Sequence, residues 1–315
     1  MERRRLIVNS DAKNEADDQF AIVHALLSPS LDIRGIIPAH FGAERTTGSR
    51  AQSREEVDLL LDLLGMSGQI IVADGADRAL PDEWTPMPSA GSRLIIDEAM
   101  SDDERLYVAF LGPLTDMASA LLEEPALQDR DVVVVWIGGP PYGGLVAEYM
   151  PEFNLGNDIH AANVVFNSRL TVWQVPMSVY TKAGVGFEEL ERRVRPHGAL
   201  GNYLTQQLID FNAKHQPSSE LRSLGDSPAI GIVMNPFGAT WRDWPRPRFS
   251  EDGRMIDPYR PATVGMPPSV RRTVESDPPN QTIRVCESFD MRWLLEDMFF
   301  KIQRHAESGP VRAAD

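Results

Sequence analysis

Three aspartates near the N-terminus have the side chains and the spacing to bind a metal ion. Asp11 is followed by the adjacent pair Asp17 and Asp18, with Asn14 and Glu15 in the segment between them. Carboxylates gathered this closely repel one another unless a cation lies between them. Oxygen atoms are the ligands that hard cations such as Ca²⁺ and Mg²⁺ prefer. The segment therefore predicts a site for a divalent cation.

Three other interpretations fit the acidic segment less well. An EF-hand loop starting at Asp11 would need Asp or Asn where the chain has Lys13, and a glycine at its sixth position, where there is none. A phosphatase with an aspartyl nucleophile would need an aspartate at the position of Asn9. Acids that merely complement a helix dipole would account for one or two carboxylates, but not for three.

The acidic segment lies between a predicted strand and a predicted helix. Leu6–Asn9 includes a short apolar run typical of a buried strand, and Asp17–Leu27 has the spacing of an amphipathic helix. The aspartates therefore follow the carboxyl end of a strand, which is where ligands bind in α/β folds.

The alternation of short apolar runs and amphipathic stretches continues to about Asn235. It predicts an α/β fold, with one large domain, a mostly parallel central sheet and helices on both faces. The predicted strands are Leu6–Asn9, Ile33–Pro38, Gln69–Ala73, Leu106–Leu111, Val132–Ile137 and Leu170–Val175. The predicted helices are Asp17–Leu27, Ser49–Leu64, Ser89–Met100, Thr115–Leu122, Asp158–Phe166, Leu200–Phe211 and Ser227–Met234.

After Asn235 the pattern changes. Prolines and turn residues predict an irregular segment over about 236–281, with a hairpin tip at 251–253. A strand over Thr282–Glu287 and a helix over Asp290–Gln303, with Asp290 as its N-cap, close the fold. We expect a single domain over residues 1–304 and a disordered tail over 305–315.

Composition narrows the class of protein. The chain of 315 residues has 46 acidic and 31 basic side chains and a net charge of −15, which argues against nucleic acid or an anionic membrane as partner. Cys286 is the only cysteine, so no internal disulfide or thiolate metal site is possible, and its predicted strand makes it a buried hydrophobe. Without a signal-peptide pattern or an apolar run long enough for a membrane span, we expect a cytoplasmic protein.

Further polar motifs occur later in the chain. Glu152 and Asn154 suit hydrogen bonding to vicinal hydroxyls, although a surface loop capped at Asp158 would explain them as well. Asp226 precedes a helix with Pro228 in its first turn and, taken alone, is an ordinary N-cap. The glycine-containing turns at 112–115 and 138–144 are not phosphate-binding fingerprints.

Taken in order, the motifs resemble those of the nucleoside hydrolases of the inosine–uridine preferring type. The resemblance rests on Asp11 with Asp17-Asp18, Gly112-Pro113-Leu114-Thr115, Gly138-Gly139, Glu152-Phe153-Asn154 with Asp158 and Ala161-Ala162, and Asp226 before Pro228. It extends from about Leu6 to Gln303. It implies the family's fold, a nucleoside as substrate, and hydrolysis of the N-glycosidic bond of a ribonucleoside or related N-riboside to ribose and free base.

The resemblance also implies roles for single residues. A Ca²⁺ ion would be held by Asp11, Asp18, Asp226 and the main-chain carbonyl of Leu111. Asp17 matches the general base that takes a proton from the attacking water, and Glu152 and Asn154 match residues that grip the ribose hydroxyls. We assign Asn14 to substrate binding as well. Relatives are homodimers or homotetramers, so the resemblance implies self-association.

The chain departs from the family's pattern in the N-terminal region. Residues 13–15 lengthen the loop before Asp17, and Asn9 replaces a frequent aspartate. His40 stands near a position where the family often has an asparagine, which makes it a candidate for substrate binding, although a structural histidine explains it equally well.

Gly225 is the most consequential departure. Many relatives have a histidine immediately before the last metal-binding aspartate, where it helps the leaving base to accept a proton. Glycine cannot do this, so either another group protonates the base or the leaving group departs without help. His215 is our candidate for such a group. Trp241 and Trp244 could stack on a nucleobase, although packing in the core or in a loop explains each of them better.

Two other functions compete with this one. A catalytically weak or silent riboside-binding protein could use the same cleft, but it would not need Asp17. A metal-dependent hydrolase of another polar substrate, such as a phosphoester, would need a basic group near the metal, and Lys13 is the only cation within the acidic motif.

Overall fold

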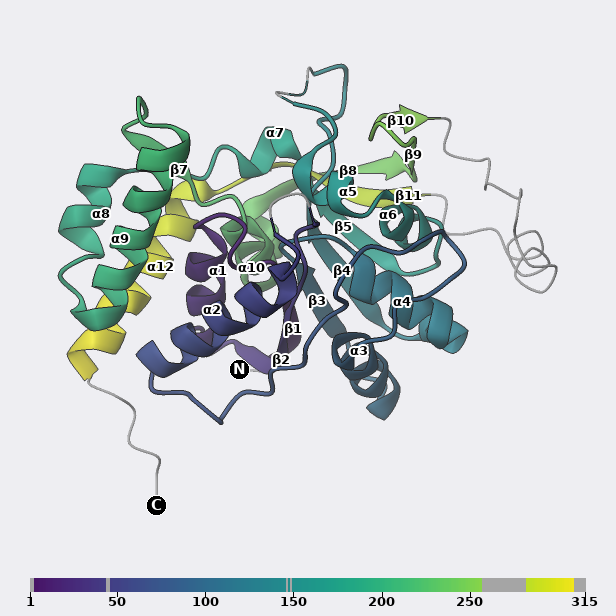
Figure 1. Ribbon diagram of the computed structural model, residues 1–315, viewed down its shortest axis with the longest axis horizontal. Helices are drawn as coiled ribbons and strands as arrows, with labels where there is room; N and C mark the ends of the chain where they lie inside the picture. The colour runs from purple at the N-terminus through teal and green to yellow at the C-terminus, as the bar shows by residue number, and fades with distance from the viewer. Residues whose placement is uncertain (1–2, 44–45, 146, 148, 257–281, 309–315) are drawn as a thin grey trace.

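Seven strands form the central sheet of the computed structural model, which describes residues 3–43, 46–145, 147, 149–256 and 282–308 (Figure 1). The strands are β1 (Arg4–Ser10), β2 (Leu31–Pro38), β3 (Leu106–Phe110), β4 (Val132–Ile137), β5 (Thr171–Val175), β8 (Ala239–Pro245) and β11 (Thr282–Phe289). Their order is β2-β1-β3-β4-β5-β11-β8. All neighbours pair in parallel except β8, which runs antiparallel to β11. The predicted α/β class with a mostly parallel sheet is confirmed.

Helices cover both faces of this sheet (Figure 1). Alternate residues of β1 show the two faces, since Leu6 and Val8 pack into one apolar cluster and Ile7 into the other. The first cluster is completed by α1 (Asp18–Leu26), α2 (Ser49–Leu63), α8 (Phe187–Arg193), α9 (Gly198–His215), α10 (Ser227–Met234) and α12 (Met291–Ser308). The second is completed by α3 (Ala90–Ser101), α4 (Thr115–Glu123), α5 (Phe153–Asn157) and α6 (Ile159–Phe166). Burial on both faces explains why β3 and β4 are almost entirely apolar.

One predicted strand is wrong. The segment Gln69–Ala73 forms only an isolated parallel bridge between Ile36 and Val72. Its two hydrogen bonds to β2 both involve Ile36, whose N–H donates to the Ile71 carbonyl (2.9 Å) and whose carbonyl accepts from the Ala73 N–H (3.0 Å). The segment therefore touches the edge of the sheet without extending it.

The proline-rich segment contains more regular structure than predicted. Besides β8, the short strands β9 (Arg248–Phe249) and β10 (Met255–Ile256) pair in antiparallel fashion, and the turn between them includes Gly253 at φ 75°. The hairpin expected at 251–253 is thus confirmed, whereas residues 257–281 lie outside the described residues.

The C-terminal helix also exceeds its predicted bounds. The Trp293 N–H donates to Asp290 Oδ1 (3.0 Å), as expected of an N-cap. The helix α12 continues to Ser308, so His305, expected in the tail, is helical; residues 309–315 lie outside the described part. Among the described helices, none is long and apolar enough to cross a bilayer.

The strand order determines where a ligand site can form. The chain leaves β1 for β2 on one side, and β3 lies on the other side of β1. Such a switch point opens a crevice at the carboxyl ends of the two strands. Asp11 follows β1 and Leu111 follows β3, so both lie beside this crevice.

Candidate active site

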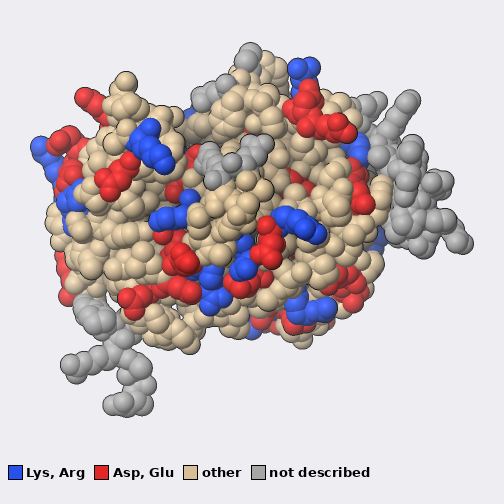
Figure 2. All heavy atoms as spheres, in the orientation of Figure 1, with Lys and Arg blue, Asp and Glu red and all other residues tan. Residues whose placement is uncertain are grey.

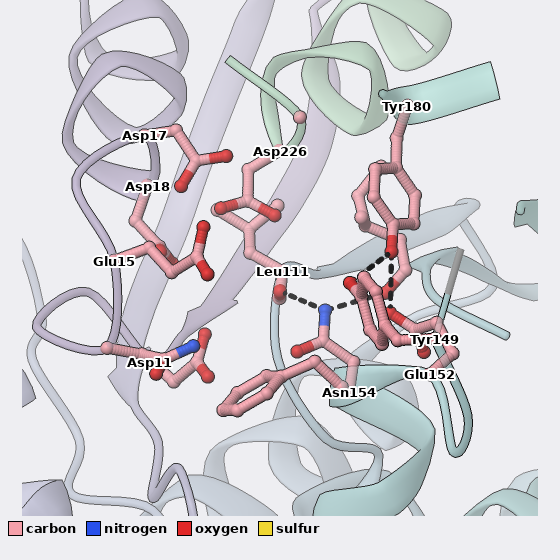
Figure 3. A pocket seen from close by; sticks show the side chains of 14 residues that line it. Asp11, Glu15, Asp17, Asp18, Leu111, Tyr149, Glu152, Asn154, Tyr180 and Asp226 are labelled. Carbon is pink, nitrogen blue, oxygen red and sulfur yellow. Dashed lines mark hydrogen bonds between the residues drawn. The ribbon is translucent and has the colours of Figure 1, made fainter. Parts of the chain in front are cut away.

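A cavity opens at this switch point (Figure 3). It is lined by Asp11, Asn14, Glu15, Asp17, Asp18, Leu111, Ile137, Tyr149, Glu152, Phe153, Asn154, Tyr180, Gly225 and Asp226. The structure therefore brings together residues from distant parts of the chain that the sequence analysis assigned to one site. Two of the predicted residues, His40 and His215, do not line it.

Three buried aspartates form the acidic side of the cavity. Carboxylate oxygens of Asp17, Asp18 and Asp226 lie within 4.8 Å of one another. Asp17 and Asp226 occupy the N-cap positions of α1 and α10, yet neither side chain caps its helix. Both point into the cavity instead (Figure 3). Asp226 thus stands at the expected N-cap position, but its side chain does not cap the helix.

Burial and mutual repulsion disfavour the charged form of these side chains. Burial, followed by the charge of a neighbouring carboxylate, raises the pKa of Asp11, Asp17 and Asp226 well above the ordinary value. Burial also raises the pKa of Asp18 to about 6, although Ser10 Oγ donates a hydrogen bond to it (2.6 Å). A cation among these carboxylates would reverse the effect, because it favours their ionised form.

The donor atoms fit a hard divalent cation. Asp11 Oδ2 is buried without a hydrogen-bond partner. Among the described residues, no lysine or arginine lines the cavity to neutralise the carboxylates. Buried carboxylate oxygens gathered in this way, with no lysine or arginine in the described lining, are the ligand set that Ca²⁺ prefers.

Two details of this acidic group differ from the predicted roles. Asp11, expected as a metal ligand, lines the cavity but lies outside the group of three whose oxygens are within 4.8 Å. Asp17, expected as the general base, belongs to that group. The Leu111 carbonyl, a further expected ligand, faces the same cavity and accepts a hydrogen bond from Asn154 Nδ2 (2.7 Å).

Three hydrogen bonds fix the Glu152 side chain on the side of the cavity opposite the aspartates. Its Oε2 accepts from the N–H groups of Gly139 (2.7 Å) and Leu155 (3.0 Å), and its Oε1 accepts from the Tyr180 hydroxyl (2.9 Å). Gly139 has φ 85°, and a Cβ there would lie 2.3 Å from Gln174 Nε2. Only glycine fits this turn, so the Gly138-Gly139 motif positions the Glu152 carboxylate.

Two ion pairs hold the N-terminal loop between Asp11 and Asp17 in place. Lys13 Nζ lies 2.6 Å from Glu56 Oε2 on α2, and Glu15 Oε2 lies 2.5 Å from a guanidinium nitrogen of Arg222. Arg222 belongs to the short strand β7 (Leu221–Ser223), which pairs with β6 (Gly184–Gly186). The loop thus contributes a further carboxylate, Glu15, to the cavity wall.

Two tyrosines of the site were missed by the sequence analysis. Tyr180 ends the short helix α7 (Met177–Tyr180), directly after the carboxyl end of β5, and its hydroxyl lies 3.3 Å from that of Tyr149. The rule that pointed to Asp11, a polar residue just after a parallel strand, could have identified Tyr180 too. Tyr149 carries no such signal, because it lies in an irregular loop.

The histidine predictions are wrong. His40 is buried, with Nε2 2.8 Å from Thr115 Oγ1 and Nδ1 accepting from the Gly42 N–H, and burial lowers its pKa to about 4. It is a structural histidine. His215 lies near the end of α9, where its ring stacks on Phe211 at 4.0 Å and its Nδ1 contacts the Phe211 carbonyl. Neither reaches the cavity.

Other predicted residues have structural roles. Asn9 Nδ2 donates to Asp116 Oδ2 (2.8 Å), away from the cavity. Trp241 packs on Trp173, with ring centroids 5.3 Å apart, and Trp244 packs on Tyr142 at 5.2 Å. Cys286 is buried in β11, as expected, and burial raises its pKa to about 12.

Comparisons with known proteins agree with this geometry. The model of a family described as inosine-uridine preferring nucleoside hydrolase matches residues 6–296. The pyrimidine-specific ribonucleoside hydrolase RihB of Escherichia coli K12 is 26% identical over 258 residues, which is 76% of this chain and 80% of the relative.

Solved structures share the fold at lower identity. A purine-preferring ribonucleoside hydrolase from Gardnerella vaginalis superposes with a TM-score of 0.76 at 20% identity, covering 97% of this chain and 100% of that one. An inosine-uridine preferring nucleoside hydrolase from Bacillus anthracis gives a TM-score of 0.65 at 16% identity, again covering 97% and 100%.

Proposed function

Because the chain belongs to the inosine-uridine preferring nucleoside hydrolase family, we propose that it hydrolyses the N-glycosidic bond of a ribonucleoside or related N-riboside with the help of Ca²⁺. The observation that carries this proposal is the group of buried carboxylates at the switch point, Asp17, Asp18 and Asp226, with the unpaired Asp11 oxygen beside it. Named relatives prefer either pyrimidine or purine ribonucleosides, so the sugar is what their substrates share.

The residues that would hold the ion come from three separate parts of the chain. Asp11 and Asp18 flank the N-terminal loop, the Leu111 carbonyl follows β3, and Asp226 precedes α10. When bound, the ion would supply positive charge that orients the sugar diol and makes a nearby water more acidic.

The chain's own side chains supply the remaining chemistry. Asp17 accepts the proton of the attacking water. Glu152, fixed by three hydrogen bonds, and Asn154 hold hydroxyls of the sugar. As the C–N bond breaks, positive charge develops on the sugar ring, and the surrounding carboxylates stabilise it.

Two aspartate variants test these roles. Asp17→Asn should lower kcat by about 10²–10⁴-fold, the range of general base catalysis. It should leave the calcium affinity, measured by titration calorimetry, much closer to wild type than Asp226→Asn does. Asp97→Asn, an exposed aspartate on α3, serves as control. Comparable turnover in Asp17→Asn would reject its role as base.

The competing functions make different predictions in a ribose-release assay with and without EDTA. A silent binding protein would bind nucleosides without releasing ribose. A phosphoesterase would need a basic group at the cavity, and among the described lining residues there is none. Self-association as a homodimer or homotetramer stays a prediction from the family.

A further inference from the structure

Apart from the carboxyl groups already assigned to the ion, the water and the sugar, the described lining of the cavity offers no acid to protonate a leaving base. All six histidines (His24, His40, His160, His197, His215, His305) and all four lysines (Lys13, Lys182, Lys214, Lys301) belong to the described residues, and none lines the cavity. Cys286 lies elsewhere in the sheet. Arg222, which pairs with Glu15 of the lining, has a guanidinium that does not give up its proton.

Tyr180 lies close to the position where a side chain on residue 225 would begin. A Cβ on Gly225 would lie 3.1 Å from Tyr180 Cδ2 and 3.3 Å from Asp17 Oδ2. The tyrosine cannot act as the missing acid, because its hydroxyl donates to Glu152 and burial raises its pKa further. Burial raises the pKa of Glu152, but both of its oxygens accept hydrogen bonds from protein donors, so neither oxygen is directed at a leaving base.

The wall of the cavity that faces the aspartates is aromatic. Tyr149 and Tyr180 lie together on the side of the cavity opposite Asp17 and Asp18 (Figure 3). The lining also contains six carboxylates (Asp11, Glu15, Asp17, Asp18, Glu152, Asp226), so even with one divalent cation bound it keeps an excess of negative charge. A cationic ring would be attracted both by this charge and by the tyrosine faces.

We propose that the preferred substrate is an N-riboside whose base carries a positive charge, such as a pyridinium or an N-alkylated purine riboside. This inference rests on the proposed function. The water oxygen bonds to the anomeric carbon and its proton passes to Asp17. The electron pair of the C–N bond returns to the ring nitrogen, which neutralises the cation. The base leaves as a neutral molecule and needs no proton. The reaction therefore does not require a proton-donating side chain at position 225.

A matched pair of probes tests the proposal in the calcium-loaded protein. Guanosine and 7-methylguanosine differ by one methyl group and one positive charge. After division by the spontaneous hydrolysis rate of each, kcat/KM for 7-methylguanosine should exceed that for guanosine by about 10²-fold or more, since an acid contributes that much to a neutral base. Equal or better use of guanosine would overturn the inference and leave the proposed function intact. Ribose release from neither probe, nor from uridine or nicotinamide riboside, would overturn both.

Binding provides a readout that does not depend on turnover. In calcium-loaded Asp17→Asn, calorimetry should show tighter binding of 7-methylguanosine than of guanosine. Tyr180→Phe keeps the ring and should keep this ratio, whereas Tyr180→Leu should lower it by about tenfold, the upper part of the range for a cation over an aromatic face. Equal affinities for the two nucleosides would contradict the proposed recognition of charge.

Discussion

At the scale of single residues, the site depends on aspartates that give up an ordinary structural role. Asp17 and Asp226 stand at helix N-cap positions, where a capping side chain stabilises a helix by about 1 kcal/mol. Neither caps, and both add buried negative charge to the cavity instead. Glu152 differs, because it accepts the Leu155 N–H at the start of α5 while it lines the cavity. The acidic side of the site is therefore less stable than its surroundings without a cation.

This instability predicts a pH dependence. The pKa of Asp18 is raised from 3.8 to about 6, so between these values the folded protein binds more protons than the unfolded chain, and stability falls as pH rises. Burial and neighbouring carboxylates also raise the pKa of Asp11, Asp17 and Asp226 well above the ordinary value, so these groups add to the fall with the same sign. In EDTA the melting temperature should decrease as pH rises from about 4 upward through 6.

Calcium should remove this dependence, because it binds the ionised carboxylates of the folded state. Thermal melts at several pH values, with EDTA or with excess Ca²⁺, give the comparison. Asp226→Asn should flatten the EDTA curve, and the exposed Asp97→Asn should not. Melting curves that coincide with and without calcium at every pH would contradict a cation site among these aspartates.

At the scale of elements, the site needs contacts that hold its loops. The N-terminal loop is clamped between Glu56 on α2 and Arg222 on β7. Arg222 is nearly buried and its guanidinium lies over the Phe211 ring at 4.6 Å, so it connects the two-stranded sheet of β6 and β7, the helix α9 and the loop. These contacts fix the backbone of residues 13–15 next to Asp17.

Loss of the arginine should release the loop. Arg222→Gln leaves Glu15 without its partner and should reduce the free energy of unfolding by about 1–3 kcal/mol, the cost of losing a charge-assisted hydrogen bond. It should lower kcat/KM as well, since Asp17 follows Glu15 closely. Denaturant unfolding and the ribose-release assay measure both effects. Arg192→Gln on α8, where the arginine is exposed, is the control; equal effects of the two variants would argue against the clamp.

At the scale of the whole molecule, the net charge of −15 attracts cations to a protein whose cavity is itself acidic. On the face shown in Figure 2, acidic and basic side chains are interspersed instead of being gathered in separate patches. Among the described residues, the one group of three carboxylates close enough to share a metal ion is Asp17, Asp18 and Asp226 in the cavity wall.

Salt should consequently weaken the use of a cationic substrate and spare a neutral one. Raising the ionic strength from about 0.01 M to 0.15 M shortens the screening length from about 30 Å to about 8 Å. We expect kcat/KM for 7-methylguanosine to fall several-fold over this range, with kcat nearly constant and uridine unaffected. Parallel changes for both substrates would show that long-range charge plays no part in their selection.

Much of this protein follows from local sequence patterns. Alternating apolar runs determined the strands and helices around the sheet, because burial on both faces leaves a signal in every segment. The order of motifs determined the family and assembled Asp11, Asp17, Asp18, Glu152, Asn154 and Asp226 as one candidate site.

Tertiary structure decided what no local pattern contains. Whether Asp226 caps its helix or faces the cavity depends on which elements meet at the switch point. His40 and His215 have the chemistry for the site but lie in other surroundings, whereas Tyr180 fills the space beside Gly225. The physical reason is that burial, repulsion and close approach arise between residues far apart in the chain, and the fold alone sets those distances.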